Sequence, residues 1–247
     1  GGIKRIGSVT SKLVPLMGTI YIGGCLIVIV ANASKLPDLV MLIVTSAFST
    51  EAAFGGFLGI LINGVKRACF SNEAGMGSAP IAHSAATTHE PVREGVVALL
   101  EPFVDTVVIC TMTALVILIS GVTDGTGVVL TANAFDSAIG GFGQYFVPVA
   151  VTLFAYSTLL SWCYYGEQAT EYLWGSKAVL KYKIVFCTLS FIGAIWKSDA
   201  VLNFSDSMLG LMVVPNLIAV AFLFPKLNAE VKSYFARLNN NEFKVFK

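Results

Sequence analysis

Long apolar segments constrain the folding of this chain more than any other feature of its sequence. A helix that crosses a bilayer needs about 20 predominantly apolar residues, and six segments of the 247-residue chain approach that description. Charged residues make up 13% of the chain, against roughly 25% of an average soluble domain. We therefore predict an all-α, polytopic transmembrane helical bundle of about six spans. The expected spans cover residues 13–31, 36–62, 96–120, 145–165, 184–196 and 208–224.

The second of these segments, residues 36–62, carries polar residues and glycines at its centre. Ser49, Thr50 and Glu51 are followed closely by the pair Gly55–Gly56. Backbone that leaves its helical hydrogen bonds at membrane depth must line a cavity or be buried in protein. We therefore expect this span to be discontinuous, and we expect a small ligand to bind at the break.

The positions of the basic residues predict which side of the membrane each loop faces. If the amino end is cytoplasmic, all but two of the 16 Lys and Arg residues fall on the cytoplasmic side, and only Lys35 and Lys197 fall outside. Cytoplasmic loops of membrane proteins are enriched in these residues. We therefore expect a cytoplasmic loop at residues 1–12, a transmembrane domain at 13–224 and a cytoplasmic tail at 225–247, with both termini cytoplasmic.

The two ends of the chain lead to further expectations. The tail combines basic with aromatic residues, and two interpretations stay open: it lies on the anionic leaflet of the membrane, or it is a solvated end. The first residues resemble a loop and contain neither a starting Met nor a signal peptide. We expect the chain to be the carboxyl-terminal part of a longer protein.

Acidic residues within the spans are candidates for function because a charge is expensive inside a membrane. Glu101 and Asp105 are four residues apart and share one helix face. For both, a structural partner or a capped helix end is favoured over ion translocation. Glu51 lies in the broken segment, where lining an ion path and satisfying freed backbone donors remain equal alternatives.

Hydroxyl groups gather in the fourth span, where Ser157, Thr158 and Ser161 precede Trp162. Hydroxyl oxygens can bind a hard cation such as Na⁺, and an indole beside them can close a small pocket. The alternative is ordinary helix packing, in which Ser and Thr donate to the carbonyl four residues earlier or across helices. That packing interpretation is favoured on these residues alone.

Other chemical sites find little support in the sequence. His83 and His89 are six residues apart without a matching acid or Cys pattern, so a loop or packing role is favoured over a metal site. The Gly75-Met76-Gly77 stretch lacks the spacing of a nucleotide-binding loop. The sequence contains no nucleic-acid-binding motif, and no reaction chemistry surrounds the acidic residues. We expect no cofactor, no nucleic-acid partner and no enzymatic activity.

One long motif resembles a known family. Residues 64–121, which include FSNEAGMGSAP at 70–80, are similar to the signature region of the prokaryotic alanine or glycine:cation symporters. The stretches GGIKRI, VPLMGTIY, AAFGGFLG and WCYYGEQATEYL resemble the same family, so that the resemblance covers nearly the whole chain apart from the tail.

The resemblance implies a LeuT-type fold of five plus five spans in an inverted repeat. This chain would supply the fifth span and the second repeat, while the first repeat, which completes the site, is absent from it. The break would lie around Phe48 to Gly56, and the SNEAGMGSAP stretch would pack at the cytoplasmic gate. By similarity, the substrate-binding residues are Phe54, Gly55, Leu58, Thr158 and Trp162. The candidate Na⁺ ligands are Ser157, Thr158 and Ser161.

The function implied is import of a small neutral amino acid, alanine or glycine, across a bacterial inner membrane. Na⁺ is the expected coupling ion and H⁺ the alternative. Two rival interpretations remain: a truncated membrane scaffold or sensor that transports nothing, and a passive channel. A channel would need a continuous polar stripe along several spans, whereas the polar groups here cluster near the middle of two.

Overall fold

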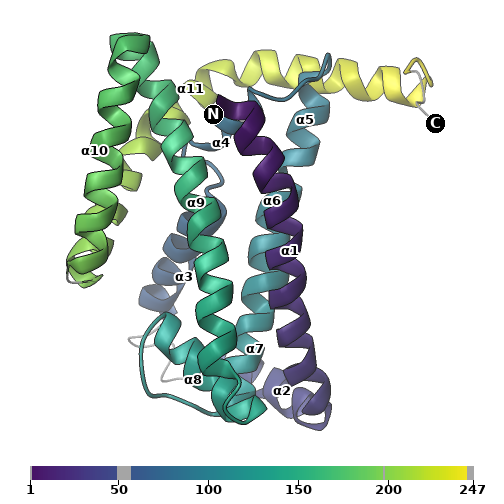
Figure 1. Ribbon diagram of the computed structural model, residues 1–247. Coiled ribbons are helices and arrows are strands. Elements are labelled where there is room, and N and C mark those ends of the chain that lie inside the picture. The colour runs from purple at the N-terminus through teal and green to yellow at the C-terminus, as the bar shows by residue number, and fades with distance from the viewer. Residues whose placement is uncertain (1, 49–56, 197, 244–247) are drawn as a thin grey trace. The chain divides into compact units, whose positions relative to one another are not determined.

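The computed structural model describes residues 2–48, 57–196 and 198–243, and the regular structure of these residues is entirely helical (Figure 1). This confirms the predicted all-α class. In chain order the helices are α1 (Gly2–Ala31), η1 (Ala33–Lys35), α2 (Leu36–Ala47), α3 (Phe57–Asn72), α4 (Ala79–His83), α5 (Pro91–Ala98), α6 (Leu100–Pro102), η3 (Phe103–Cys110), α7 (Thr111–Ser120), α8 (Val128–Ile139), α9 (Gly143–Trp174), α10 (Ser176–Ile195) and α11 (Ser198–Asn239).

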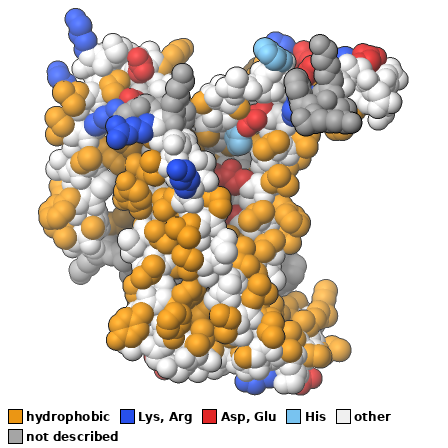
Figure 2. Space-filling model, turned by 45° about the vertical axis from the view of Figure 1, so that its right-hand side comes forward, with side chains coloured by type: hydrophobic (Ala, Val, Ile, Leu, Met, Phe, Trp, Pro, Cys, Tyr) orange, Lys and Arg blue, Asp and Glu red, His pale blue; other side chains and the backbone are white. Residues whose placement is uncertain are grey.

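Five helical stretches among the described residues are long and apolar enough to cross a membrane. Hydrophobic side chains (orange) are spread widely over the face seen in Figure 2, and in α10 no residue of the most apolar stretch is buried within the described part of the chain. A surface this apolar is stable only against lipid or further protein. The five stretches are Arg5–Ala31, Pro91–Ser120, Gly143–Trp174, Ser176–Ile195 and Ala200–Asn239.

The remaining expected span, residues 36–62, begins with a helix that is too short to cross a membrane. The helix α2 ends at Ala47, and Phe48 leaves helical geometry with φ −107° and ψ 13°. Helix α3 begins at Phe57 and has 16 residues. Residues 49–56, which carry the polar and glycine-rich centre of the segment, lie outside the described residues.

Two compact units make up the chain: Gly1–Arg67 with Val104–Ala169, and Ala68–Phe103 with Thr170–Lys247. The first has an aromatic core in which Tyr21 of α1 contacts Phe135 of α8 and Phe146 of α9, with ring centroids 6.1 and 6.2 Å away. Gly24 allows this approach, since a Cβ there would lie 2.4 Å from the Phe146 ring. The buried members of the core are Tyr21, Cys25, Val28, Val116, Ile119, Ala134, Phe135, Phe146, Val147 and Ala150.

The second unit contains α4, α5, α6, α10 and α11 and buries few side chains. Its longest element, α11, has 42 residues and contains Pro215 and Pro225. A proline removes one backbone donor and bends a helix. Figure 1 shows that α11 curves, and its last part (yellow) runs crosswise to α10 and over the end of α5.

Several helices extend past the expected boundaries of the spans. Residues 2–12 are helical and belong to α1, not to a loop, because no proline interrupts them and an existing helix extends at little cost. Residues 225–239 of the expected tail continue α11 through Pro225, where Leu227, Val231 and Tyr234 recur at helical spacing. The sixth span is likewise continuous through Pro215. The loop expected between the third and fourth spans contains α8.

Candidate functional site

The hydroxyl groups expected to bind a cation lie within about one turn of α9. Ser157 is buried, and its Oγ donates to the Phe154 carbonyl at 2.8 Å, while the Met17 sulfur of α1 lies 3.6 Å from the same oxygen. The Ser161 Oγ donates to the Ser157 carbonyl at 3.2 Å. These bonds to preceding carbonyls are the ordinary packing arrangement of a helical Ser. They leave the lone pairs of each hydroxyl oxygen available as acceptors.

The expected substrate-binding residues are only partly brought together. Thr158 is exposed and Trp162 half-buried, and they stand one turn apart on α9. The Trp162 ring meets the Tyr165 ring edge-on, with centroids 5.7 Å apart. Leu58 lies near the start of α3 with 67% of its surface exposed. Phe54 and Gly55 lie outside the described residues.

The third span contains a π-helical segment that sequence reasoning did not predict. This segment, η3, covers Phe103–Cys110 and includes the acidic residue Asp105. The Thr106 hydroxyl donates to the Asp105 carboxylate at 3.3 Å, and both side chains are half-buried. Segments with π-helical pairing are rare and occur frequently at functional sites. Asp105 therefore remains a functional candidate.

The family motif forms a tight loop after α3. Glu73 has a φ of 53°, and Gly75 and Gly77 have φ values of 77° and 98°. The Ser78 hydroxyl, which is fully buried, donates to the Glu73 carboxylate at 2.5 Å. The Asn216 amide of α11 donates to the Gly75 carbonyl at 2.9 Å. The glycines of the motif are therefore needed for backbone conformations that other residues adopt with strain.

His83 stands between two carboxylates that are distant from it in the sequence. Its Nδ1 lies 2.7 Å from Glu94 Oε1 of α5, and its Nε2 lies 3.9 Å from Glu101 Oε2 of α6. The sequence favoured a packing role for His83 and a structural partner for Glu101. Within the second unit the structure places these two side chains beside one another, which agrees with both interpretations.

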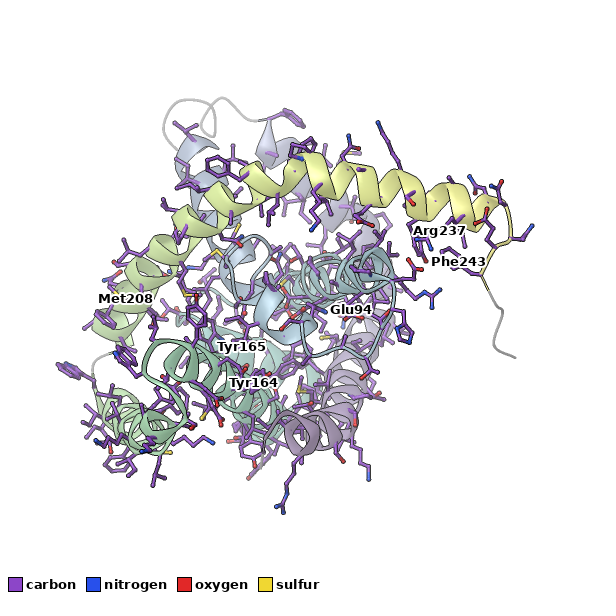
Figure 3. All side chains as sticks on the ribbon, turned by 90° about the horizontal axis from the view of Figure 1, so that it is seen from above. Glu94, Tyr164, Tyr165, Met208, Arg237 and Phe243 are labelled. Carbon is purple, nitrogen blue, oxygen red and sulfur yellow. The ribbon has the colours of Figure 1, made fainter. Side chains whose placement is uncertain are left out.

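Arg237 near the end of α11 binds Glu90, the N-cap residue of α5, through two hydrogen bonds of 2.7 Å. These bonds, together with the charge of the guanidinium, hold the pKa of Glu90 below its usual value. The Phe243 ring lies 4.9 Å from the Arg237 guanidinium carbon and 5.5 Å from that of Arg93. Figure 3 shows Arg237 and Phe243 side by side at this end of α11.

Sequence reasoning missed the partners Asn216, Glu94 and Arg237. Asn216 did carry a signal, because an amide inside the apolar run of the sixth span must find a hydrogen-bond partner. Glu94 and Arg237 carried none, since charged residues near membrane ends are common. Their partners become visible only in three dimensions.

Five helical stretches among the described residues can cross a membrane, so the fold is that of a multi-pass membrane protein. In a further expected span the first helix, α2, ends at Ala47. Residues 1–247 match the model of the sodium:alanine symporter family, and the chain belongs to this family.

Three relatives illustrate the range of this similarity. The sodium/alanine symporter AgcS of Methanococcus maripaludis is 42% identical over 99% of this chain and 55% of the relative. The probable sodium/glutamine symporter GlnT of Bacillus subtilis is 38% identical over 100% and 52%. The sodium/proton-dependent alanine carrier protein of Bacillus sp. PS3 is 32% identical over 98% and 59%. The chain thus spans about half the length of the curated relatives it matches.

Proposed function

We propose that this chain is the carboxyl-terminal part of a cation-coupled importer of a small neutral amino acid, alanine or glycine. Membership of the sodium:alanine symporter family carries the proposal. The multi-pass helical architecture supports it. Transport by such a protein requires no covalent chemistry, so the proposed role is not enzymatic.

The proposed architecture is the second half of a LeuT-type inverted repeat. In such a fold the ends of half-helices bind an amino acid near the centre of the membrane. The end of α2 at Ala47 carries partial negative charge, and the start of α3 at Phe57 carries partial positive charge. A zwitterionic amino acid has a carboxylate for the second end and an ammonium for the first.

The proposed substrate pocket combines the broken segment with α9. Gly55 would allow close approach of the substrate and Leu58 would add an apolar wall. Trp162, one turn beyond Thr158, would limit the side chain to about the size of a methyl group. Phe54 completes the proposed set. The exposed position of Thr158 is compatible with this arrangement.

Na⁺ is the proposed coupling ion, with H⁺ as the alternative. Ser157, Thr158 and Ser161 are the candidate ligands. The donation of both serine hydroxyls to helix carbonyls is compatible with a cation role, because their oxygens retain lone pairs for a metal ion. We further propose a bacterial inner membrane location with cytoplasmic termini, which rests on the distribution of Lys and Arg.

Uptake of radiolabelled alanine into proteoliposomes tests the coupling. The protein should be the full-length transporter that contains this chain, and this chain alone should be measured beside it. Uptake by the full-length protein should collapse when external Na⁺ is replaced by K⁺ at constant pH. Uptake that ignores both Na⁺ and pH gradients would favour a channel, and no uptake by either protein would favour a scaffold.

A matched pair of serines tests the cation site. The Ser161→Ala variant should raise the Na⁺ concentration needed for half-maximal uptake, because it removes a proposed ligand. Ser190 of α10 donates to its i−4 carbonyl at 2.8 Å in the same way, so Ser190→Ala is the control for loss of helix packing. Equal Na⁺ dependence in both variants would remove Ser161 from the site.

A further inference from the structure

An apolar groove runs between α5 and the last part of α11, entirely within the second unit. It has a volume of about 720 Å³, which lies in the range of small-molecule sites. One wall includes Val92 and Gly95 of α5 and Leu99 directly after it, and the other includes Leu227 and Val231 of α11. Over the residues of α11 that line it, Leu223 to Phe235, the groove is about 18 Å long at 1.5 Å per helical residue.

The Arg237–Glu90 pair holds one end of the groove in place. It joins the C-terminal arm, residues 225–239 of α11, to the N-cap residue of α5. The Phe243 ring contacts the guanidinium groups of both Arg93 and Arg237 at the same end. Tyr234 is buried beside the Phe243 ring, with centroids 5.1 Å apart. The two walls of the groove are therefore joined by the protein itself.

The groove has one basic group, and its position suits a membrane surface. Lys226 lines the groove directly after the apolar stretch that ends at Phe224. Its ammonium has no ion-pair partner among the residues that the structure describes. The other charged lining residue, Glu230, is one turn further along the arm. Lys226 is thus an available cation where apolar and polar parts of α11 meet.

We propose that this groove binds an anionic phospholipid of the leaflet that faces the C-terminal arm. One acyl chain lies along the aliphatic walls, and the phosphate of the headgroup contacts Lys226. A long side chain such as Lys reaches from the end of a membrane helix to the headgroup layer. The attraction of one basic residue to an anionic lipid surface then selects anionic over zwitterionic lipids.

The chemistry of the walls favours an acyl chain over a polypeptide. A peptide would bring backbone N–H and C=O groups that need partners once they are buried. Lys226 and Glu230 are the two charged residues among those that line the groove, and the rest of the lining is apolar or glycine. A hydrocarbon chain needs only apolar contact, which this lining supplies.

Lipid retention by the purified chain tests the proposal without any transport assay. The chain in detergent micelles is mixed with phosphatidylglycerol and phosphatidylcholine of identical acyl composition, and native mass spectrometry counts each bound lipid. We expect phosphatidylglycerol to be retained in preference. Lys226→Gln should reduce this preference roughly fivefold, the factor expected for one basic residue. Lys232→Gln removes a charge from the same arm outside the groove lining and should leave the preference almost unchanged.

A second pair of variants tests the acyl site. A Cβ at Gly95 meets no atom within 4 Å, so Gly95→Leu places a side chain in the groove and should reduce retention of both lipids at least tenfold. Gly193 of α10 is equally open, and Gly193→Leu is the control. Circular dichroism checks that each variant keeps its helices. If Gly95→Leu loses its helices, the exposed substitution Lys226→Gln still tests the proposal.

Three results would overturn the proposal. Equal losses for Lys226→Gln and Lys232→Gln would mean diffuse attraction to the arm. Equal retention of both lipids by the unmodified chain would mean that no headgroup is selected. A dimer that Gly95→Leu abolishes would mean that a second copy of the chain fills the groove.

Discussion

In the first compact unit, α1, α7, α8 and α9 bury the aromatic rings of Tyr21, Phe135 and Phe146 against one another. In the second unit, the described contacts between distant segments include single polar pairs, such as Asn216 with Gly75 and Arg237 with Glu90. A close-packed apolar core resists opening at every contact, whereas one hydrogen bond contributes only about 1 kcal/mol net. The second unit should therefore rearrange at much lower cost than the first.

This difference matters because the family motif lies in the second unit. Its loop is held by bonds that can break one at a time, while the α9 hydroxyls stand in the first unit beside a rigid core. Under the proposed function both properties would be needed, since in alternating access one part rocks or gates against another around a fixed site. The predictions below test the difference, beginning with the core.

Truncation of Phe135 should give the largest effect. Its side chain is fully buried between Tyr21 and Phe146, and Phe→Ala in a core costs about 3–5 kcal/mol. Cys25 is also fully buried in this core and reports its opening. In a variant that keeps only this cysteine, Phe135→Ala should speed maleimide labelling of Cys25 by a factor of 100 or more, at tenfold per 1.4 kcal/mol.

The control for this measurement is an exposed aromatic residue. Phe222 has 82% of its surface exposed on α11, so Phe222→Ala should leave the labelling of Cys25 unchanged. Similar acceleration in both variants would mean that the first unit has no independent core.

Replacement of Gly77 should give an intermediate effect. Its φ of 98° is strained for any residue with a Cβ, and that Cβ would lie 3.3 Å from Asn216 Cβ. Such strain costs roughly 1–3 kcal/mol. We expect Gly77→Ala to lower the resistance of the chain to unfolding by SDS. Gly210→Ala, at an open helical position of α11, should be neutral or stabilising by up to ~1 kcal/mol. A neutral Gly77→Ala would show that the motif loop does not require its glycine here.

Loss of the Asn216 amide should be smaller and local. Asn216→Leu removes the hydrogen bond to Gly75 and should cost about 1 kcal/mol. The Met76 amide, which donates to the Glu73 carbonyl at 3.1 Å, should then exchange its hydrogen about fivefold faster by mass spectrometry. Asn203→Leu on the same helix is the control, because the side-chain amide of Asn203 makes no hydrogen bond among the described residues. Unchanged exchange at Met76 would mean that Asn216 does not anchor the motif loop.

The sequence predicted the parts of this fold that hydropathy determines. The five long apolar helices appear because a membrane span must satisfy its own backbone and present apolar side chains. The end of α2 at Ala47 agrees with the polar centre that follows it. Hydropathy does not report how far a helix continues beyond its apolar stretch, which is why it does not predict the helix at residues 2–12 and 225–239. The π-helical pairing of η3 has no signal in residue type.

The site could be predicted less completely than the fold. The cluster of hydroxyls on α9 was visible because helical spacing alone brings Ser157 and Ser161 together. The pairs Asn216–Gly75 and Arg237–Glu90 join residues 141 and 147 positions apart. A single sequence contains no periodicity at such separations. The roles of Thr158 and Trp162 rest on family resemblance, and they stay predictions.

The Arg237–Glu90 pair should show the smallest effect at neutral pH and a distinct dependence on acid. Because Arg237 lowers the pKa of Glu90, the bridge contributes fully above the ordinary carboxyl pKa of about 4.3. That contribution declines below this pH and is lost as the pH falls through the lowered pKa of Glu90 in the folded chain.

Spin labels at Ala98→Cys and Asn240→Cys measure the position of the arm. The distribution of distances between them should be narrow at pH 7 and broader in strong acid. Arg237→Gln should broaden it already at pH 7 and abolish the acid transition. Arg93→Gln removes a cation–π contact, worth about 0.5–1 kcal/mol at an exposed site. It also removes a charge that lowers the pKa of Glu90 less than Arg237 does, so the acid transition should remain. If Arg237→Gln and the unmodified chain showed the same acid midpoint, titratable groups other than Glu90 would release the arm. The Arg237–Glu90 pair would then not be a contact that distinguishes the second unit from the first.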